Sequence, residues 1–314
     1  MTQNLKGKLV TVFGGSGFLG RYVTQALLAQ GARLRVAGQS AVSGQHLKVL
    51  GNLGQVQLIA ADVCKPASLA RAVAGADMAV NLVGSFDHLN AVQHLGAANV
   101  AKAAAAAGCS ALVHISAIGA DAQSAAEYGR SKAAGEAAVL KAFPAAVILR
   151  PSIVFGREDA FVNRFAGLIR MLPIVPVIGA ATQFQPVFVG DVARAVTSAL
   201  QDTAYAGATL ELGGPQVLTM RALNEWIAAA IGRDPMFVDV PDFAAHALAR
   251  GTGWMPGAPI TLDQFRMLGS DNIVSAGKDG LAIMDIAATP LDAVAHDWLN
   301  IYRKHGRFGG RAAA

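Results

Sequence analysis

The sequence predicts an α/β protein built on a doubly wound parallel sheet. Three observations point to this fold class: short apolar runs alternate with helical stretches over residues 9–149, a glycine-rich turn separates the first apolar run from the first helix, and 53% of the 314 residues are hydrophobic. Strands that alternate with helices form parallel sheets, because each helix carries the chain back across one face. The apolar composition is sufficient to bury such a sheet on both faces.

The elements of this sheet follow one another along the chain. An apolar strand over residues 9–13 leads through the glycine turn into a helix over residues 22–29. Further strands are predicted at residues 33–37, 55–60, 78–83, 111–116 and 146–149. Further helices are predicted at residues 67–74, 91–107 and 125–143.

Beyond Pro151 the alternation gives way to short elements and to loops rich in glycine and proline. The predicted elements there are helices at 161–171, 192–200 and 291–304 and strands at 186–189 and 208–212. We therefore predict two domains. Residues 1–158 form a nucleotide-binding domain to which residues 185–214 return, and residues 159–184 and 215–314 form a smaller C-terminal α/β lobe.

The turn Val10–Arg21, which reads VTVFGGSGFLGR, has the composition of a dinucleotide-binding turn. Glycines let the backbone approach a diphosphate closely, and the first N–H groups of the following helix hold its charge. A plain strand-to-helix turn is the alternative. The position between a strand and a helix favours the binding interpretation and the Rossmann version of the fold.

The residues near this turn favour NADP(H) over NAD(H). In the NAD version, a carboxylate about 20 residues past the glycines binds the ribose 2′-hydroxyl, but the first acidic residue of this chain is Asp62. Arg21 is therefore the preferred ligand of a 2′-phosphate, and Gln39 and Ser40 could complete the pocket. Arg35 either reaches that phosphate or faces solvent.

Further cofactor contacts are expected where the third and fourth strands end. Asp62 could accept a hydrogen bond from the adenine amino group, or it could cap the helix that starts near Pro66. The NLVG stretch at 81–84 ends the fourth strand. The residues predicted to bind the cofactor are Gly14, Ser16, Gly17, Phe18, Leu19, Gly20, Arg21, Gln39, Asp62, Val63, Leu82, Val83, Gly84, Lys132 and Pro151.

A candidate catalytic set follows. Tyr128 and Lys132 lie four residues apart on a predicted helix, so their side chains share a face and the ammonium can lower the tyrosine pKa. Ser116, at the end of the fifth strand, could orient a substrate oxygen. The alternative is a pair on the helix surface with no role in catalysis.

Taken together, these motifs resemble the extended and atypical short-chain dehydrogenase/reductases, also called the NAD-dependent epimerase/dehydratase family. The resemblance also includes LRPSIVFG at 149–156 and FVGDVARAV at 188–196. It implies that Arg150 and Pro151 lead into a substrate lobe, and that Tyr128 and Lys132 serve catalysis and the nicotinamide ribose. One position departs from the family pattern, because Ala91–His94 stands where members often carry an Asn.

A narrower resemblance extends over nearly the whole chain. Segments 155–166, 185–193, 259–275 and 288–308 are similar to the nucleotide-binding accessory subunits of respiratory complex I and their bacterial relatives. That resemblance implies tightly held NADPH without established turnover, complex I subunits as partners, and a position where the peripheral arm meets the membrane. The alternative is an active NADPH-dependent reductase, epimerase or dehydratase acting on a carbonyl or sugar-nucleotide substrate.

Composition excludes several other classes of protein. The net charge of +5 comes from scattered basic residues, so we expect no nucleic-acid partner, and isolated histidines predict no metal site. The first residues lack a signal peptide, and no run of about 18 apolar residues predicts a membrane span. We therefore expect a cytoplasmic protein with peripheral contact on the cytoplasmic face of the inner membrane. The basic tail at 302–311 is solvated, or it contacts a membrane or partner. The helix at 161–172 presents a core face, or it contacts a membrane or partner.

Overall fold

The computed structural model describes residues 3–255, 258, 260–304 and 306. The chain divides into two compact units. The first, which we call the sheet unit, contains residues up to Pro151 together with Val189–Leu212 and Ser275–Ala287. The second unit contains Ser152–Phe188, Gly213–Val274 and the residues from Ala288 onward.

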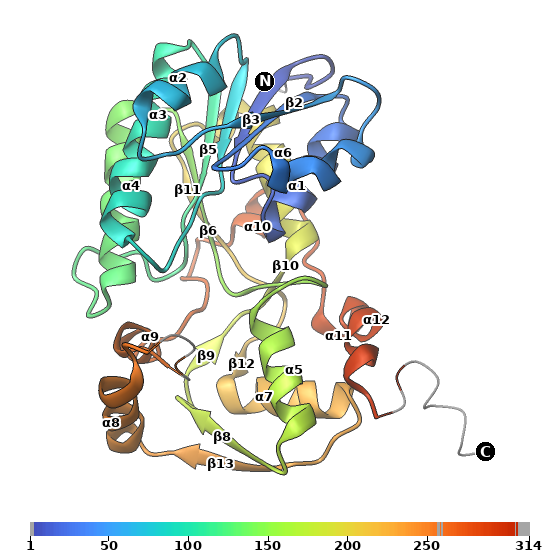
Figure 1. Ribbon diagram of the computed structural model, residues 1–314, viewed down its shortest axis with the longest axis vertical. Helices are drawn as coiled ribbons and strands as arrows, with labels where there is room; N and C mark the ends of the chain where they lie inside the picture. The colour runs from blue at the N-terminus through green and yellow to red at the C-terminus, as the bar shows by residue number, and fades with distance from the viewer. Residues whose placement is uncertain (1–2, 256–257, 259, 305, 307–314) are drawn as a thin grey trace. The chain divides into compact units, whose positions relative to one another are not determined.

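The sheet unit is organised around seven parallel strands in the order β11-β6-β5-β4-β1-β2-β3. Crossing from β1 to β4 on one side and to β2 on the other makes the sheet doubly wound, which confirms the predicted fold class (Figure 1). The strands are β1 Leu9–Phe13, β2 Arg33–Gly38, β3 Val56–Ala60, β4 Met78–Asn81, β5 Ala111–Ile115, β6 Val147–Pro151 and β11 Thr209–Leu212.

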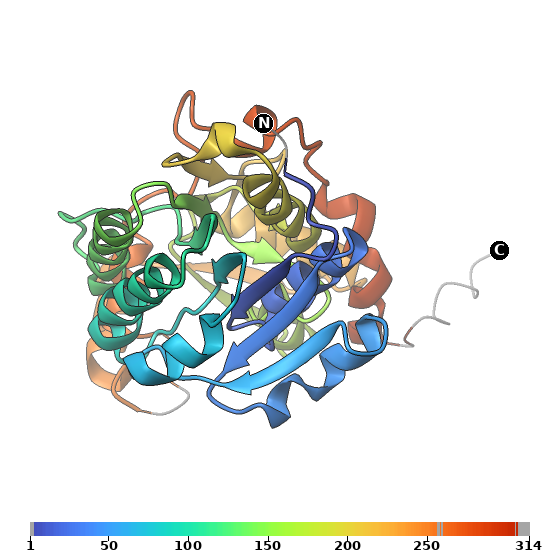
Figure 2. The same ribbon diagram turned by 90° about the horizontal axis from the view of Figure 1, so that it is seen from above.

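Helices cover both faces of this sheet (Figures 1 and 2). On one face α3 packs against α2 and α4, and on the other α1 packs against α6. Phe13, Leu112 and Ile148 of the strands form one apolar core with Val100 of α3 and Val139 of α4. The helices are α1 Phe18–Ala29, α2 Pro66–Val73, α3 Ala97–Ala106, α4 Glu127–Ala142, α6 Val189–Gln201 and α10 Gly280–Ile283, with 3-10 turns at Val42–Leu50 (η1) and Thr203–Tyr205 (η3).

Two helices depart from their predictions. The predicted helix at 291–304 is divided into short helices at Leu291–Val294 and His296–Leu299 and a 3-10 turn at Asn300–Tyr302. The sequence predicts a continuous α-helix over 91–107, but its first part, η2 at Asn90–Gly96, is a π-helix that runs directly into α3. Such wide turns are rare and often occur at functional sites.

The second unit contains three small two-stranded sheets and several helices. Phe155, Ile169 and Leu299 belong to its core, which Phe161 and Phe165 join from the side. The apolar stripe of the 161–172 segment is therefore a core face. The strands are β7 Val154–Phe155, β8 Ile174–Ile178, β9 Gln183–Phe184, β10 Val187–Phe188, β12 Leu218–Thr219 and β13 Met236–Val240. The helices are α5 Phe161–Met171, α7 Met220–Ala230, α8 Asp242–Thr252, α9 Leu262–Met267, α11 Leu291–Val294 and α12 His296–Leu299, followed by η4 at Asn300–Tyr302.

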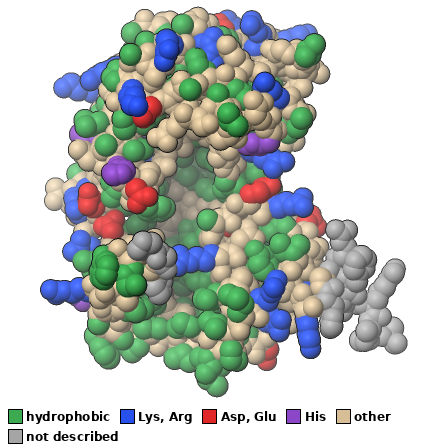
Figure 3. All heavy atoms as spheres, in the orientation of Figure 1, with side chains coloured by type: hydrophobic (Ala, Val, Ile, Leu, Met, Phe, Trp, Pro, Cys, Tyr) green, Lys and Arg blue, Asp and Glu red, His purple; other side chains and the backbone are tan. Residues whose placement is uncertain are grey.

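The pair β8–β13 buries only one of its faces. Val175 and Val177 point into the second unit, whereas Ile174, Met236 and Val238 are exposed. Figure 3 shows apolar side chains gathering at the foot of the view, where Figure 1 draws these strands.

Of the predicted basic tail, Arg303 donates to the carbonyl of Ala230, and the residues after 306 lie outside the described part of the chain. No helix within the described ranges has the length and apolarity that crossing a membrane requires.

The segment Ser275–Ala287 clusters with the sheet unit, whereas the sequence pattern predicts it within the C-terminal lobe. Ser275 donates its N–H to the carboxylate of Glu211 on β11 (2.7 Å), and Glu211 donates its N–H to the carbonyl of Lys278 (3.1 Å). Gly280 lies so close to β11 that an added Cβ would be 2.8 Å from the Cβ of Leu210. These contacts attach the segment to the edge strand.

Arg150 on β6 joins the edge of the sheet to α4. Its guanidinium donates to both carboxylate oxygens of Glu136 (2.9 and 2.6 Å) and lies 3.6 Å from Glu211, and both carboxylates are buried. The hydrogen bonds that Arg150 donates to Glu136 raise the pKa of Arg150. A bidentate pair of this kind holds strand and helix in one geometry.

We predict that Arg150→Met lowers the free energy of unfolding by about 3–5 kcal/mol, because it leaves two buried carboxylates without their cation. Urea denaturation monitored by circular dichroism measures the change. The control is Lys8→Met, which removes the exposed pair between Lys8 and Asp77 and should cost less than about 1 kcal/mol. Equal losses for the two variants would contradict the prediction.

Candidate functional site

A cavity of about 1170 Å³ opens in the sheet unit where strands β1 to β4 end. Its walls come from the turn after β1, the segment after β2, the residues after β3 and the loop after β4. The position matches the rule that doubly wound sheets bind ligands beyond the carboxyl ends of their strands. The predicted cofactor residues that line it are Gly14, Ser16, Gly17, Phe18, Leu19, Gly20, Gln39, Val63, Leu82, Val83 and Gly84.

The glycine turn brings the start of α1 to this cavity. Gly14 adopts a φ of 76°, in the left-handed region that side chains disfavour, and its N–H donates to the carbonyl of Ala37 (2.9 Å). An added Cβ at Gly20 would lie 2.5 Å from the Gly14 oxygen, so α1 packs directly on the turn. No described side chain caps the N-terminus of α1. Its first N–H groups are therefore available to a diphosphate.

Hydroxyl and amide groups line the cavity at the end of β2. Ser16, Gln39, Ser40 and Ser43 all lie on its wall. The Ser43 hydroxyl donates to the carbonyl of Ser40 (2.7 Å) and lies 3.4 Å from the Ser16 hydroxyl. This end of the wall has no carboxylate among the residues that line it. It therefore contains hydrogen-bonding groups without negative charge.

Neither of the two arginines considered for a 2′-phosphate lines the cavity, although Arg21 directly follows Gly20, which does. Arg21 is exposed on α1 and is not among the residues that line the cavity. Arg35 donates to the carbonyls of Ala72 (2.8 Å) and Ala74 (2.7 Å) at the end of α2. Arg35 therefore neither reaches the cavity nor faces solvent freely, since it ties β2 to α2.

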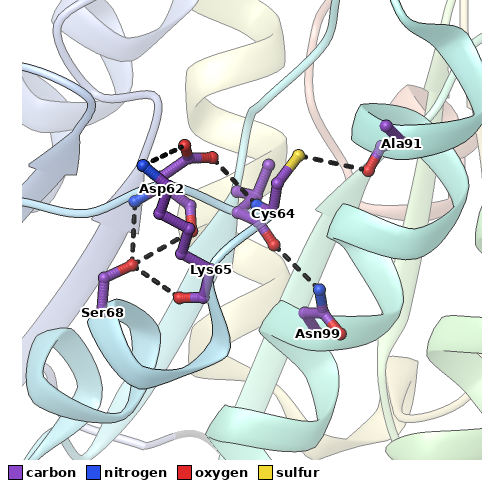
Figure 4. Close-up of polar contacts among 7 residues, drawn as sticks. Asp62, Cys64, Lys65, Ser68, Ala91 and Asn99 are labelled. Carbon is purple, nitrogen blue, oxygen red and sulfur yellow. Dashed lines mark hydrogen bonds and ion pairs between the residues drawn. The ribbon is translucent and has the colours of Figure 1, made fainter.

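Asp62 is used locally in this structure (Figure 4). One carboxylate oxygen accepts the N–H of Cys64 (2.9 Å), and the other lies 3.8 Å from the ammonium of Lys65. These contacts form a turn before α2, whose N-cap residue is Lys65 and which has no side-chain cap, so Asp62 does not cap the helix as the alternative to an adenine contact predicts. The neighbouring Val63 lines the cavity, and Asn99 supports it by donating to its carbonyl (3.0 Å).

The predicted catalytic residues lie beside the cavity but do not line it. Tyr128 stacks on Phe86 with ring centroids 5.0 Å apart and planes at 20°. The Lys132 ammonium is 5.8 Å from the Tyr128 ring centroid and donates weakly to the carbonyl of Ile115 (3.4 Å). Ser116 is buried, and its hydroxyl has no hydrogen-bond partner within the described ranges.

Burial controls the proton affinities of this set. It raises the pKa of Tyr128 to about 12 and lowers the pKa of Lys132 to about 8, although the Glu136 carboxylate opposes the second effect. The expectation that Lys132 lowers the tyrosine pKa is therefore not met, because removing the phenolate from water outweighs the distant ammonium.

Two buried polar residues escaped the sequence analysis. His114 sits two positions before Ser116, so strand alternation places both side chains on one face of β5. The Asn81 carbonyl oxygen accepts the N–H of Val83 (3.1 Å), which assigns its amide nitrogen as donor to His114 Nδ1 (3.0 Å). Burial lowers the pKa of this histidine to about 3. The histidine is therefore neutral, with its proton on Nε2.

Gln93 is the second. It lies on η2 where an Asn was sought, is only 2% exposed, and donates to the carbonyl of Ser85 (2.5 Å). Its amide oxygen has no partner in the part of the chain that the structure describes. A glutamine within a predicted helix carries no sequence signal that its side chain will be buried and will bond to a neighbouring loop. No group of three His, Cys, Asp or Glu side chains among the described residues could hold a metal ion.

The comparisons with known proteins agree with this geometry. Residues 10–213 match the sequence profile of the NAD dependent epimerase/dehydratase family. The chain belongs to this family. It is 34% identical to the mitochondrial NADH dehydrogenase (ubiquinone) 1 alpha subcomplex subunit 9 of Arabidopsis thaliana, with 97% of this chain and 80% of the relative covered. The Mus musculus protein of the same name is 31% identical over 96% of this chain and 82% of its own.

These relatives confirm the narrower resemblance, since the similarity extends through the second unit. A solved structure shows the same fold. The Citrobacter sp. triphenylmethane reductase complexed with NADP(H) superposes with a TM-score of 0.76 at 19% identity, covering 92% of this chain and 99% of its own.

The pKa of Lys132 yields a prediction for stability. Between its folded value of about 8 and its ordinary value of 10.5, the unfolded chain binds more protons than the folded one. The free energy of unfolding should therefore rise from pH 8 to pH 10 by about 2–3 kcal/mol from this residue and stay flat below pH 8. Urea denaturation of the native protein and of Lys132→Met measures the difference.

The control is Lys141→Met, an exposed lysine on the same helix. It should preserve the rise that Lys132→Met removes. A rise that persists in Lys132→Met would show that other groups cause it.

Proposed function

We propose that the protein holds NADP(H) in the cavity of the sheet unit and acts as an accessory-type subunit that associates with respiratory complex I. The observation that carries this proposal is the similarity to subunit 9 of the mitochondrial NADH dehydrogenase over 97% of the chain. In this proposal the nucleotide has a structural or regulatory role. The location of Ser116, Tyr128 and Lys132 outside the cavity wall supports that role.

The cavity fits a dinucleotide. The start of α1 would bind the diphosphate, Val63 and the end of β3 would flank the adenine, and Leu82–Gly84 would border the nicotinamide half. The hydroxyl and amide groups of Ser16, Gln39 and Ser43 would accommodate a 2′-phosphate, which a carboxylate would repel. We retain Asp62 as an adenine contact, Pro151 as a cofactor contact and Arg21 as a phosphate ligand within this proposal.

Association with complex I would place the protein at the inner membrane through its partner. We propose peripheral contact with the cytoplasmic face of that membrane. The exposed apolar residues of the second unit, including Ile174 and Met236, are compatible with such a partner.

The nucleotide preference is tested with Arg21→Ala. We expect this variant to weaken NADPH binding about tenfold or more, because a hydrogen bond to a charged group is worth about 1.5–3 kcal/mol. NADH, which lacks the 2′-phosphate, should bind within about twofold of its native affinity. Fluorescence titration measures both, and Arg33→Ala is the control because Arg33 is exposed at the far end of β2. Equal losses for the two nucleotides would refute the role of Arg21.

The partner is tested by purification from native membranes. A tagged chain should recover complex I subunits, and mass spectrometry of the isolated protein should find NADP(H). Recovery of the nucleotide without any complex I subunit would refute the association and leave the cofactor assignment intact.

A second candidate function is an NADPH-dependent reductase, epimerase or dehydratase with a carbonyl or sugar-nucleotide substrate. It is favoured by one observation: Tyr128 and Lys132 share α4, and the lysine pKa of about 8 keeps a labile proton near neutral pH. Bound NADPH that is oxidised by a carbonyl compound in the native protein, but not in Tyr128→Phe, would support this function over the first.

A further inference from the structure

The loop after β4 separates the cavity from Tyr128. We call residues 84–89 the Phe86 loop. Ser85, Phe86, Asp87 and His88 all line the cavity, whereas Tyr128 does not. The Phe86 ring stacks on the Tyr128 ring, and Phe86 itself is 64% exposed.

We infer that the Phe86 loop is a gate, in which Phe86 covers Tyr128 and keeps it from whatever the cavity holds. The inference deepens the proposed function, since it supplies a physical reason for a bound nucleotide that is not consumed. A proton transfer between the Tyr128 hydroxyl and a substrate in the cavity would require Phe86 to swing away first.

The backbone of the loop is strained at one end. His88 adopts a φ of 53°, and among the described residues only Asp285 shares a left-handed conformation without being glycine. Such a conformation is strained in a residue other than glycine and persists only where surrounding contacts maintain it. The other end begins at Gly84, beside which lies the Lys132 ammonium: an added Cβ at Gly84 would be 3.8 Å from it.

One side chain of the π-helix holds the loop in place. Gln93 donates its amide N–H to the Ser85 carbonyl, and Ser85 in turn accepts the N–H of Asp87 on its hydroxyl (3.0 Å). The buried Gln93 carbonyl oxygen is left without a partner in the described part of the chain. The wide turn of η2 thus aims Gln93 at the loop rather than at solvent.

The covering contact is weak enough to reverse. A stacked aromatic pair adds only a small attraction beyond its buried area. The closed arrangement therefore needs only a small differential affinity to shift toward an open one. A ligand that contacts the loop from the cavity can supply that difference.

The test uses nucleotide-free full-length protein and nitration by tetranitromethane at pH 8, with rates at each tyrosine read by peptide mass spectrometry. In the native protein Tyr128 should react at least tenfold more slowly than Tyr205, the internal reference. Phe86→Ala should raise the rate at Tyr128 at least tenfold and leave Tyr205 within twofold. Gln93→Leu should raise it severalfold, because the loop loses its tether.

Two controls keep the result specific. Phe86→Trp retains an aromatic cover and should stay slow, and Phe243→Ala removes a phenylalanine that is 80% exposed on α8 and should change nothing. Circular dichroism checks that each variant folds. Spectrophotometric titration gives a second readout, in which Phe86→Ala should move the pKa of Tyr128 from about 12 toward its ordinary 10.

Fast nitration of Tyr128 in the native protein, or an unchanged rate in Phe86→Ala, would overturn the gate. Because these measurements need no nucleotide, they stand if the chain fails to bind NADP(H). Binding of NADP(H) together with an uncovered Tyr128 would overturn the gate alone and leave the proposed function in place.

Discussion

The close approach of α1 to the turn after β1 is the constraint on which the site depends. Gly20 lies so near the backbone of residues 14–15 that no Cβ fits, and Gly14 itself requires a left-handed conformation. These two glycines allow the helix to begin directly at the end of a central strand. Because β1 sits between β4 and β2, the first turn of α1 faces the point where the strand order reverses, and the cavity forms there.

The sheet and much of the cavity wall were predictable from the sequence because they depend on local patterns. Short stretches of sequence are enough to show apolar runs, spaced glycines and the absence of carboxylates before residue 62. All the strands of the sheet were therefore predicted within a few residues of their observed bounds. The hydrogen bonds of Arg35 were not predictable, because its acceptors are carbonyls at the end of α2, which only the fold brings beside β2. The same holds for His114 and Gln93, whose partners lie on other elements. The wide turn at η2 has no distinct pattern, since an Ala-rich stretch is equally compatible with an α-helix.

The polar residues behind the cavity form a buried layer with unusual proton affinities. A neutral histidine on β5 lies near two residues of α4, a lysine with a depressed pKa and a tyrosine with a raised one. Burial is the main cause of each shift, so the layer responds to whatever admits water. Its state is therefore coupled to the position of Phe86 over Tyr128. An accessory protein and a working reductase could then differ in how often that cover opens while the reactive groups stay the same.

The sheet unit is assembled from three separate stretches of chain, and the last of them, Ser275–Ala287, attaches to the edge strand β11. A ribosome makes β1 through β6 early, yet β11 follows nearly sixty residues later and its attached segment only near the end of synthesis. Until β11 is made, the β6 edge of the sheet is unpaired. Arg150 can then pair with Glu136 but not yet with Glu211. The unpaired N–H and C=O groups of an exposed strand edge can pair with another chain. The β6 edge is therefore the place where an incomplete chain is most open to pairing with another strand.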